Sequence, residues 1–177
     1  CGWYTPLMGT PWSRRSGEGV PPHPTLSDYY ARDEDRPDFV RRLFDSSARD
    51  YDRIEGNMAL GWGRWYRREA LLRAGLSQGM RVLDVAIGTG LVAREAARVA
   101  GDTSRVIGLD PSVGMLAEAR QHLRVHGVLG IGEQLPFGDE SFDFLSMGYA
   151  LRHLSDLSVT LREFPRVLKP GGVVCVL

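Results

Sequence analysis

From residue 80 onward, short apolar runs alternate with segments in which apolar residues recur every three or four positions. The short runs predict buried strands, and the longer period predicts helices that bury one face. Alternating strands and helices are typical of a parallel sheet covered by helices on both faces, so we predict a doubly wound, mainly parallel α/β fold. The expected strands are 81–86, 105–109, 128–131, 142–147 and 171–177, and the expected helices are 90–100, 112–125 and 156–168.

Two more helices are predicted before this alternating unit. The first covers 39–48, with Phe39, Leu43 and Phe44 on one side, and the second covers 57–74 and ends before Gly75. The apolar side of the second helix is expected to hold Met58, Trp62, Trp65, Tyr66 and Leu72.

The chain is therefore expected to have three parts: an arm at 1–37, a helical lid at 38–77 and a sheet domain at 78–177. The arm holds six of the ten prolines and four glycines, a composition that predicts an extended or flexible segment. Its aromatic residues are candidates for anchoring it.

Composition narrows the class of protein. Hydrophobic residues make up 43% of the 177 positions, and 22 basic residues balance 22 acidic ones, so nucleic-acid binding is not expected. No apolar run approaches the roughly 18 residues needed to span a bilayer. Cys1 and Cys175 do not form a disulfide framework, and a reduced cytoplasmic setting is expected. Because the chain starts with Cys and ends on an apolar strand, we expect the natural protein to continue, with the sheet truncated after its fifth strand.

The run RVLDVAIGTG at 81–90 carries the candidate chemistry. A glycine turn between a strand and a helix, with Asp110 at the end of the next strand, is typical of a nucleoside site. The dinucleotide pattern G-x-G-x-x-G would need glycine at Ala86 and Leu91, and it fails there. Asp84 suits an ammonium group better than a pyrophosphate, which favours S-adenosylmethionine over NAD. An ordinary tight strand-to-helix turn is the alternative.

Four blocks of the chain resemble class I S-adenosylmethionine-dependent methyltransferases and, more narrowly, the ubiquinone/menaquinone biosynthesis C-methyltransferase family. They are FDSSARDYDRIEGNMALGWGRWY (44–66), VLDVAIGTG (82–90), LPF…FDFLSMGYALRHLSD (135–156) and RVLKPGGVVCVL (166–177). Like the family, the chain has an alanine at Ala86, where most methyltransferases have glycine. It departs from the family pattern at Ile54, Glu55, Gly63, Tyr66, Leu91, Ile131, Gly148 and His153.

The resemblance implies a role for each matched residue. Asp84 would hold the cofactor's ammonium group, Asp110 its ribose hydroxyls, and Met115 its adenine, although Asp84 could instead support the following helix and Met115 could be a core residue. The other implied cofactor residues are Ala86, Gly88, Thr89, Gly90, Pro111, Gly132, Glu133 and Gly148. No cluster of Cys and His has metal-ligand spacing, so no metal is expected.

The implied reaction is methyl transfer to a small aromatic or quinol acceptor, which depends mainly on positioning. Methylating a ring carbon also requires loss of a phenolic proton, with His153 as candidate base and Arg152 as candidate phenolate partner. A surface or helix-capping role is the alternative for His153. An apolar lid with Phe44, Tyr51, Met58, Trp62 and Trp65 would suit a prenylated acceptor, although core packing explains these residues equally well.

Two other functions remain open. The protein could methylate another small molecule at O, N or C, or it could be a non-catalytic module that binds a nucleoside or a partner. Peripheral membrane contact and a homodimer are both compatible with the sequence.

Overall fold

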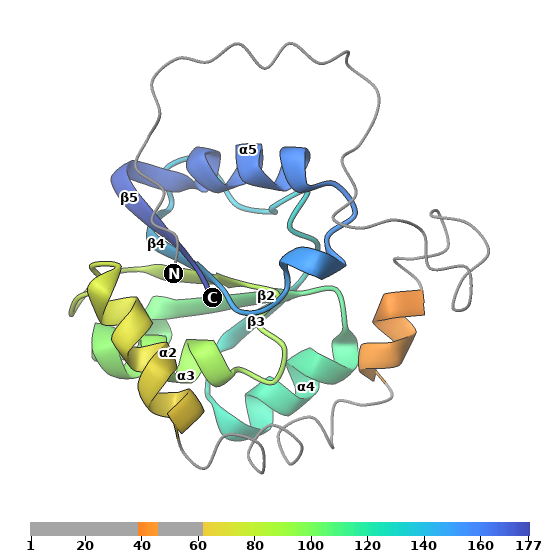
Figure 1. The fold of residues 1–177 in the computed structure, drawn as a ribbon, viewed down its shortest axis with the longest axis horizontal. Coiled ribbons are helices and arrows are strands. Elements are labelled where there is room, and N and C mark those ends of the chain that lie inside the picture. Colours follow the sequence, from red (N-terminus) through yellow and green to blue (C-terminus); the bar gives the residue numbers. More distant parts are fainter. Residues whose placement is uncertain (1–38, 46–61) are drawn as a thin grey trace.

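The computed structural model describes residues 39–45 and 62–177. Its centre is a five-stranded sheet in the order β3-β2-β1-β4-β5, in which every neighbouring pair is parallel (Figure 1). The doubly wound α/β prediction is thus confirmed. The strands are β1 Val82–Val85, β2 Val106–Asp110, β3 His126–Leu129, β4 Phe142–Met147 and β5 Leu168–Val176.

Helices cover both faces of the sheet. Figure 1 shows α5 on one side and α2, α3 and α4 on the other. The α-helices are α2 Trp62–Arg73, α3 Leu91–Ala100, α4 Val113–His122 and α5 Leu157–Val167, and residues 39–45 form a further short helix. Two 3-10 turns, η2 Thr103–Arg105 and η3 Leu151–His153, complete the described elements. None of the described helices is long and apolar enough to cross a bilayer.

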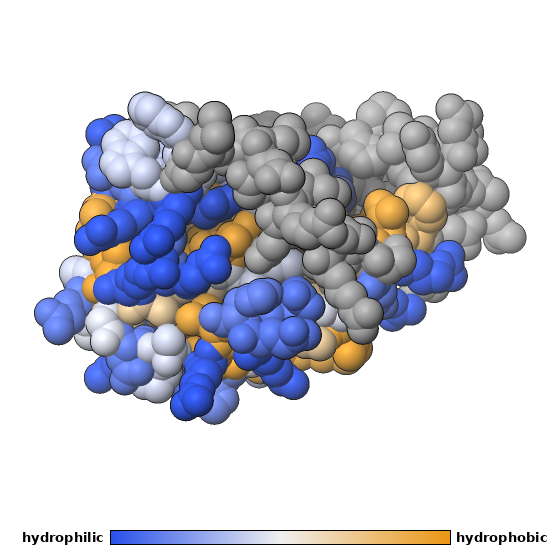
Figure 2. Space-filling model, turned by 90° about the horizontal axis from the view of Figure 1, so that it is seen from below, coloured by the Kyte–Doolittle hydropathy of each residue, from blue (hydrophilic) through white to orange (hydrophobic). Residues whose placement is uncertain are grey.

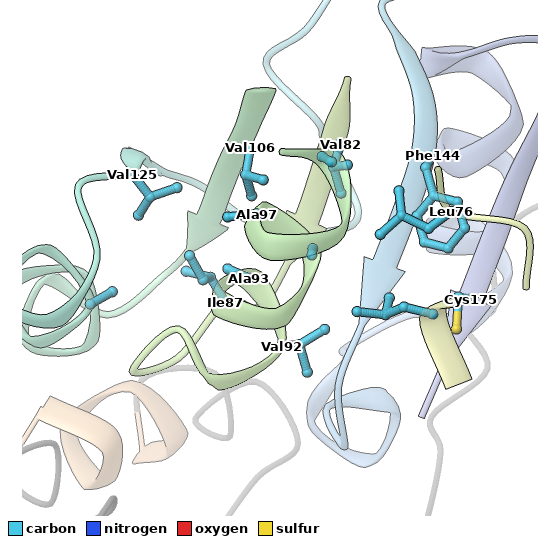
Figure 3. Packing of buried hydrophobic residues seen from close by; sticks show 14 of the residues in the cluster. Leu76, Val82, Ile87, Val92, Ala93, Ala97, Val106, Val125, Phe144 and Cys175 are labelled. Carbon is cyan, nitrogen blue, oxygen red and sulfur yellow. The ribbon is translucent and has the colours of Figure 1, made fainter. Parts of the chain in front are cut away.

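The core consists of one apolar layer on each face of the sheet. On the α3 side, Val82, Val106 and Phe144 of three neighbouring strands point toward Ala93 and Ala97 (Figure 3). The opposite layer is built from the other strand positions and from α5. Strands buried on both faces need apolar residues at nearly every position, which explains the short apolar runs in the sequence.

The path of the chain through the sheet creates one place for a ligand. From β1 the chain runs outward through β2 to β3, and then crosses back to β4 on the other side of β1. In an open α/β sheet, ligands bind at the carboxyl ends of the strands where the order reverses. Here that point lies between β1 and β4.

Several predicted boundaries were wrong by a few residues. The helix expected at 112–125 ends at His122, and the strand expected at 128–131 starts at His126, because residues 126–129 pair with β2. His126 is therefore an exposed strand residue. The last strand begins at Leu168, because Leu168 already pairs with Phe142.

The orientation of α2 is the main correction. We expected its aromatic side to face inward, but Trp62 is 72% exposed and Trp65 is 58% exposed, whereas Arg67 and Leu71 are buried. Leu71 belongs to the core cluster on the α3 side, and this packing fixes the orientation. Figure 2 shows the molecule from the side on which α2, α3 and α4 lie, where hydrophilic residues alternate with smaller hydrophobic areas. Tyr51 and Met58 of the predicted lid, the arm and the start of the predicted second helix lie outside the described residues.

Candidate functional site

A cavity lies at the carboxyl edge of the sheet, at the point where the strand order reverses. Its walls come from the loops after β1, β2 and β4, from α2 and from the helix at 39–45. The predicted cofactor residues that line it are Asp84, Ala86, Gly88, Thr89, Asp110, Pro111, Met115, Gly132, Glu133 and Gly148. Of the remaining predicted site residues, His153 lines the cavity, and Gly90 and Arg152 are not among the lining residues.

The turn after β1 depends on left-handed backbone. Ala86, Gly88 and Gly90 have φ of 56°, 55° and 89°. This conformation costs a residue with a side chain about 1–2 kcal/mol, so Ala86 is the strained position of the three. Gly90 serves as the N-cap of α3 in a left-handed conformation, so its part is to shape the turn.

Asp110 is held rigidly at one end of this turn. Its Oδ2 accepts from the Gly88 amide at 2.8 Å, and its Oδ1 accepts from the Ser112 amide at 2.9 Å. Burial raises the pKa of its carboxyl, and the two amide bonds oppose that shift. Because each carboxylate oxygen can accept two hydrogen bonds, both retain acceptor capacity toward the cavity. A pair of vicinal hydroxyls, such as those of a ribose, suits this arrangement.

Asp84 lies buried in the wall of the cavity. It is 1% exposed, its Oδ1 accepts from the Ser146 hydroxyl at 2.6 Å, and its Oδ2 has no hydrogen-bond partner within the described part of the chain. Burial raises the pKa of its carboxyl to about 7. A buried, unpartnered carboxylate oxygen is costly unless a cation reaches it. The residues present therefore fit a ligand with an ammonium group.

The wall expected to receive adenine is mostly backbone and apolar side chain. Met115 is buried at the start of α4. The Glu133 carboxylate accepts from the amides of Ser155 and Asp156 at 2.6 and 3.2 Å, which leaves mainly its backbone for a ligand. Ile131, which offers no polar side chain to a ligand, is exposed.

The helix at 39–45 connects the two rims of the cavity. Asp45 Oδ1 accepts from the Ser112 hydroxyl at 2.5 Å and from the Gly114 amide at 3.0 Å, and these bonds lower the pKa of its carboxyl. On the opposite rim, the ring of Phe44 meets that of His153 edge to face at 5.1 Å. The sequence predicted a lid in this region, but it did not identify Asp45 as its attachment point.

The predicted catalytic pair lies on η3. Arg152 Nε donates to His153 Nε2 at 3.1 Å, and Arg152 itself is exposed. His153 thus has one ring nitrogen held by Arg152 while its ring lies against Phe44 at the mouth of the cavity. Of the two residues, His153 lines the cavity and Arg152 does not. Nearby, Gly148 allows a close approach, because a Cβ there would lie 2.6 Å from Val92 Cγ2.

Sequence reasoning missed three cavity-lining residues that lie on the preceding helices. Val40 and Arg41 come from the helix at 39–45, and Arg67 comes from the inner side of α2. The sequence did not reveal Arg67, because it is not on the predicted apolar side of that helix. Among the described residues, no group of acidic, His and Cys side chains could hold a metal ion.

Fold and site together define the class of the protein. The strand order is that of a Rossmann-like doubly wound sheet, and the acidic cavity lies at its reversal point. A solved SAM-dependent methyltransferase from Aquifex aeolicus shares the fold, with TM-score 0.60 and 23% identity over 79% of this chain and 71% of that one.

The family is shown by the sequence comparison. The chain belongs to the ubiE/COQ5 methyltransferase family, whose model matches residues 30–177. The demethylmenaquinone methyltransferase of Symbiobacterium thermophilum is 40% identical over 148 residues, and the ubiquinone/menaquinone biosynthesis C-methyltransferase of Hahella chejuensis is 37% identical over 145 residues. Each alignment covers 78% of this chain but only 58% of the relative. The family implies S-adenosylmethionine as the cofactor.

Proposed function

We propose that the protein transfers a methyl group from S-adenosylmethionine to a ring carbon of a small aromatic or quinol acceptor in quinone biosynthesis. One observation supports the assignment of the cofactor in this proposal. Two buried carboxylates line a single cavity around the glycine turn, one with an unpartnered oxygen and one with both oxygens held by backbone amides. The names of the relatives support the acceptor class.

In this proposal the residues of the cavity act by binding and positioning the cofactor. Asp84 binds the ammonium end of the cofactor, Asp110 binds the ribose, and the wall at Met115 and Gly132 receives the adenine. The bound cofactor supplies an electrophilic methyl group. The protein holds it against the acceptor and excludes water with the helix at 39–45, and positioning of this kind accounts for much of the rate.

The acceptor side is assigned to the mouth of the cavity near His153. A ring carbon becomes nucleophilic when its phenolic oxygen loses a proton, and His153 is the proposed proton acceptor. Arg152 Nε donates to His153 Nε2 at 3.1 Å, so this hydrogen bond has to open before Nε2 can take the proton. Phe44 gives this mouth an aromatic wall, which suits a flat acceptor.

The outward side of α2 supports a peripheral contact between the cytoplasmic protein and a membrane. At the membrane the protein would meet prenylated acceptors. It presents Trp62, Trp65 and Leu72 with Arg68 and Arg73, and indole and guanidinium groups favour an anionic interface. In a sedimentation experiment, the protein should be recovered with vesicles that contain anionic lipid and not with vesicles of neutral lipid. Equal recovery with both compositions would remove this part of the proposal.

Two measurements test the function. Calorimetric titration with S-adenosylhomocysteine should give binding below millimolar, and its absence would refute the cofactor assignment. Incubation with a labelled methyl donor and demethylmenaquinol should give a labelled ring. Labelling of other phenols, but never of that quinol, would leave a methyltransferase with a different acceptor. Binding of S-adenosylhomocysteine without any transfer would favour a non-catalytic module.

A further inference from the structure

Tyr149, the second residue after β4, has a strained backbone. Its φ is 56°, in the left-handed region that a bulky side chain rarely adopts. Of the three described non-glycine residues with positive φ, Ala86 and Tyr149 line the cavity and Glu140 does not. Strain of this kind persists only where the surrounding structure enforces it, and it is common at functional positions.

The surrounding backbone holds Tyr149 in this conformation. Its amide donates to the Leu177 carbonyl at 2.9 Å, and the Leu177 amide donates to the Met147 carbonyl at 2.9 Å, so hydrogen bonding beside β4 extends to this residue. The preceding Gly148 lies so close to α3 that a Cβ on it would be 2.6 Å from Val92 Cγ2. If only the turn mattered, glycine or asparagine would be favoured at position 149, because both adopt the left-handed conformation at lower cost. The tyrosine side chain therefore needs a reason of its own.

The side chain of Tyr149 has no partner within the described part of the chain. Its hydroxyl makes no hydrogen bond there, its ring makes no aromatic contact, and the residue is 51% exposed. It lines the same cavity as Phe44 and His153, the aromatic pair at the mouth. A half-exposed aromatic residue in a cavity wall offers a ligand a flat surface on which to stack.

We propose that Tyr149 is a specificity-determining residue for the methyl acceptor, whose flat ring stacks on the tyrosine ring. This inference rests on the proposed function, because it requires an aromatic or quinol acceptor in the cavity. Aromatic pairs gain affinity beyond the apolar area that they bury. The hydrogen-bonded backbone fixes the position of Tyr149 before the acceptor arrives, so less order has to be created on binding. A saturated ring of the same size should therefore bind more weakly than a flat one.

The test combines two ligands with several variants, in anaerobic calorimetric titrations of the whole chain saturated with S-adenosylhomocysteine. The ligands are 1,4-naphthalenediol, a flat quinol, and its fully hydrogenated form, which keeps both hydroxyls and loses the flat ring. The wild type should bind the flat diol more tightly, and Tyr149→Leu should reduce this preference by about 2- to 12-fold, the range for one aromatic pair. Tyr149→Phe should keep the preference. Tyr66→Leu, at another exposed tyrosine that does not line the cavity, is the matched control and should also keep it.

The outcomes separate this inference from the function on which it rests. If the wild type does not bind S-adenosylhomocysteine, the proposed function fails, and if it then does not bind the flat diol, the proposed acceptor class fails and this inference with it. If both ligands bind and Tyr149→Leu keeps the full preference, or if Tyr66→Leu loses as much of it, the function stands and the role of Tyr149 is overturned. Tyr149→Gly relaxes the backbone, so it should fold even if Tyr149→Leu does not, and it should show the same loss.

Discussion

Asp84 offers the sharpest test of the site. Its proposed role requires a buried carboxylate, which destabilises the folded protein when no ligand is bound. Burial raises the pKa of its carboxyl from its ordinary 3.8 to about 7. That difference corresponds to about 4 kcal/mol of lost stability once the group is ionised in the folded protein. Asp84→Asn keeps an acceptor for the Ser146 hydroxyl and removes the charge. The ligand-free variant should therefore be more stable than the wild type at alkaline pH.

The pH dependence gives the sign of this effect. Between pH 3.8 and 7, the folded wild type holds a proton on Asp84 that the unfolded chain releases, so wild-type stability falls as pH rises through this window. The stability advantage of Asp84→Asn should grow by about 3 kcal/mol between pH 5 and pH 8 in chemical unfolding experiments. Asp102→Asn is the control, because the pKa of Asp102 is lowered and its removal should give no such gain.

Asp84→Asn should also change the affinity of the protein for S-adenosylhomocysteine. At pH 8, Asp84→Asn should bind S-adenosylhomocysteine more weakly by about 1.5–3 kcal/mol, because it cannot pair with the ammonium. Wild-type affinity should rise as pH increases through about 7, and the affinity of the variant should not. A variant that is less stable than the wild type by the same amount at both pH values would refute the reasoning. Higher stability with unchanged affinity would refute the ammonium role alone.

Three more substitutions probe the cavity and the contact between α4 and the helix at 39–45. Asp110→Ala should weaken S-adenosylhomocysteine binding by about 1–3 kcal/mol in calorimetry, and unchanged affinity would contradict the ribose role. Gly148→Ala should lower the free energy of unfolding by about 1–3 kcal/mol, because its Cβ would lie 2.6 Å from Val92 Cγ2; wild-type stability would show that this loop shifts freely. Gly114→Ala places a Cβ 3.1 Å from the Cα of Asp45, so it should speed ligand dissociation in stopped-flow measurements, and an unchanged rate would argue against a lid.

The order of strands and helices after residue 80 could be predicted from the sequence, because the signals are local. Short apolar runs mark strands buried on both faces, and glycines in left-handed conformation mark the turn after β1. The position of Asp110 also followed from local spacing, since parallel strands end at one edge of the sheet. Element ends such as those of α4 and β3 were less predictable, because pairing with β2 decides them.

Only the tertiary structure decided which side of α2 faces inward. A helical pattern of Trp62, Trp65 and Leu72 predicts a buried aromatic side, but Leu71 and the Arg64–Glu95 pair turn the helix so that Arg67 is buried. The same holds for the contact of Asp45 with Gly114, which lies 69 positions further along the chain. The periodicity of a sequence reports how polar a side of a helix is, whereas the partner across the interface determines which side is buried.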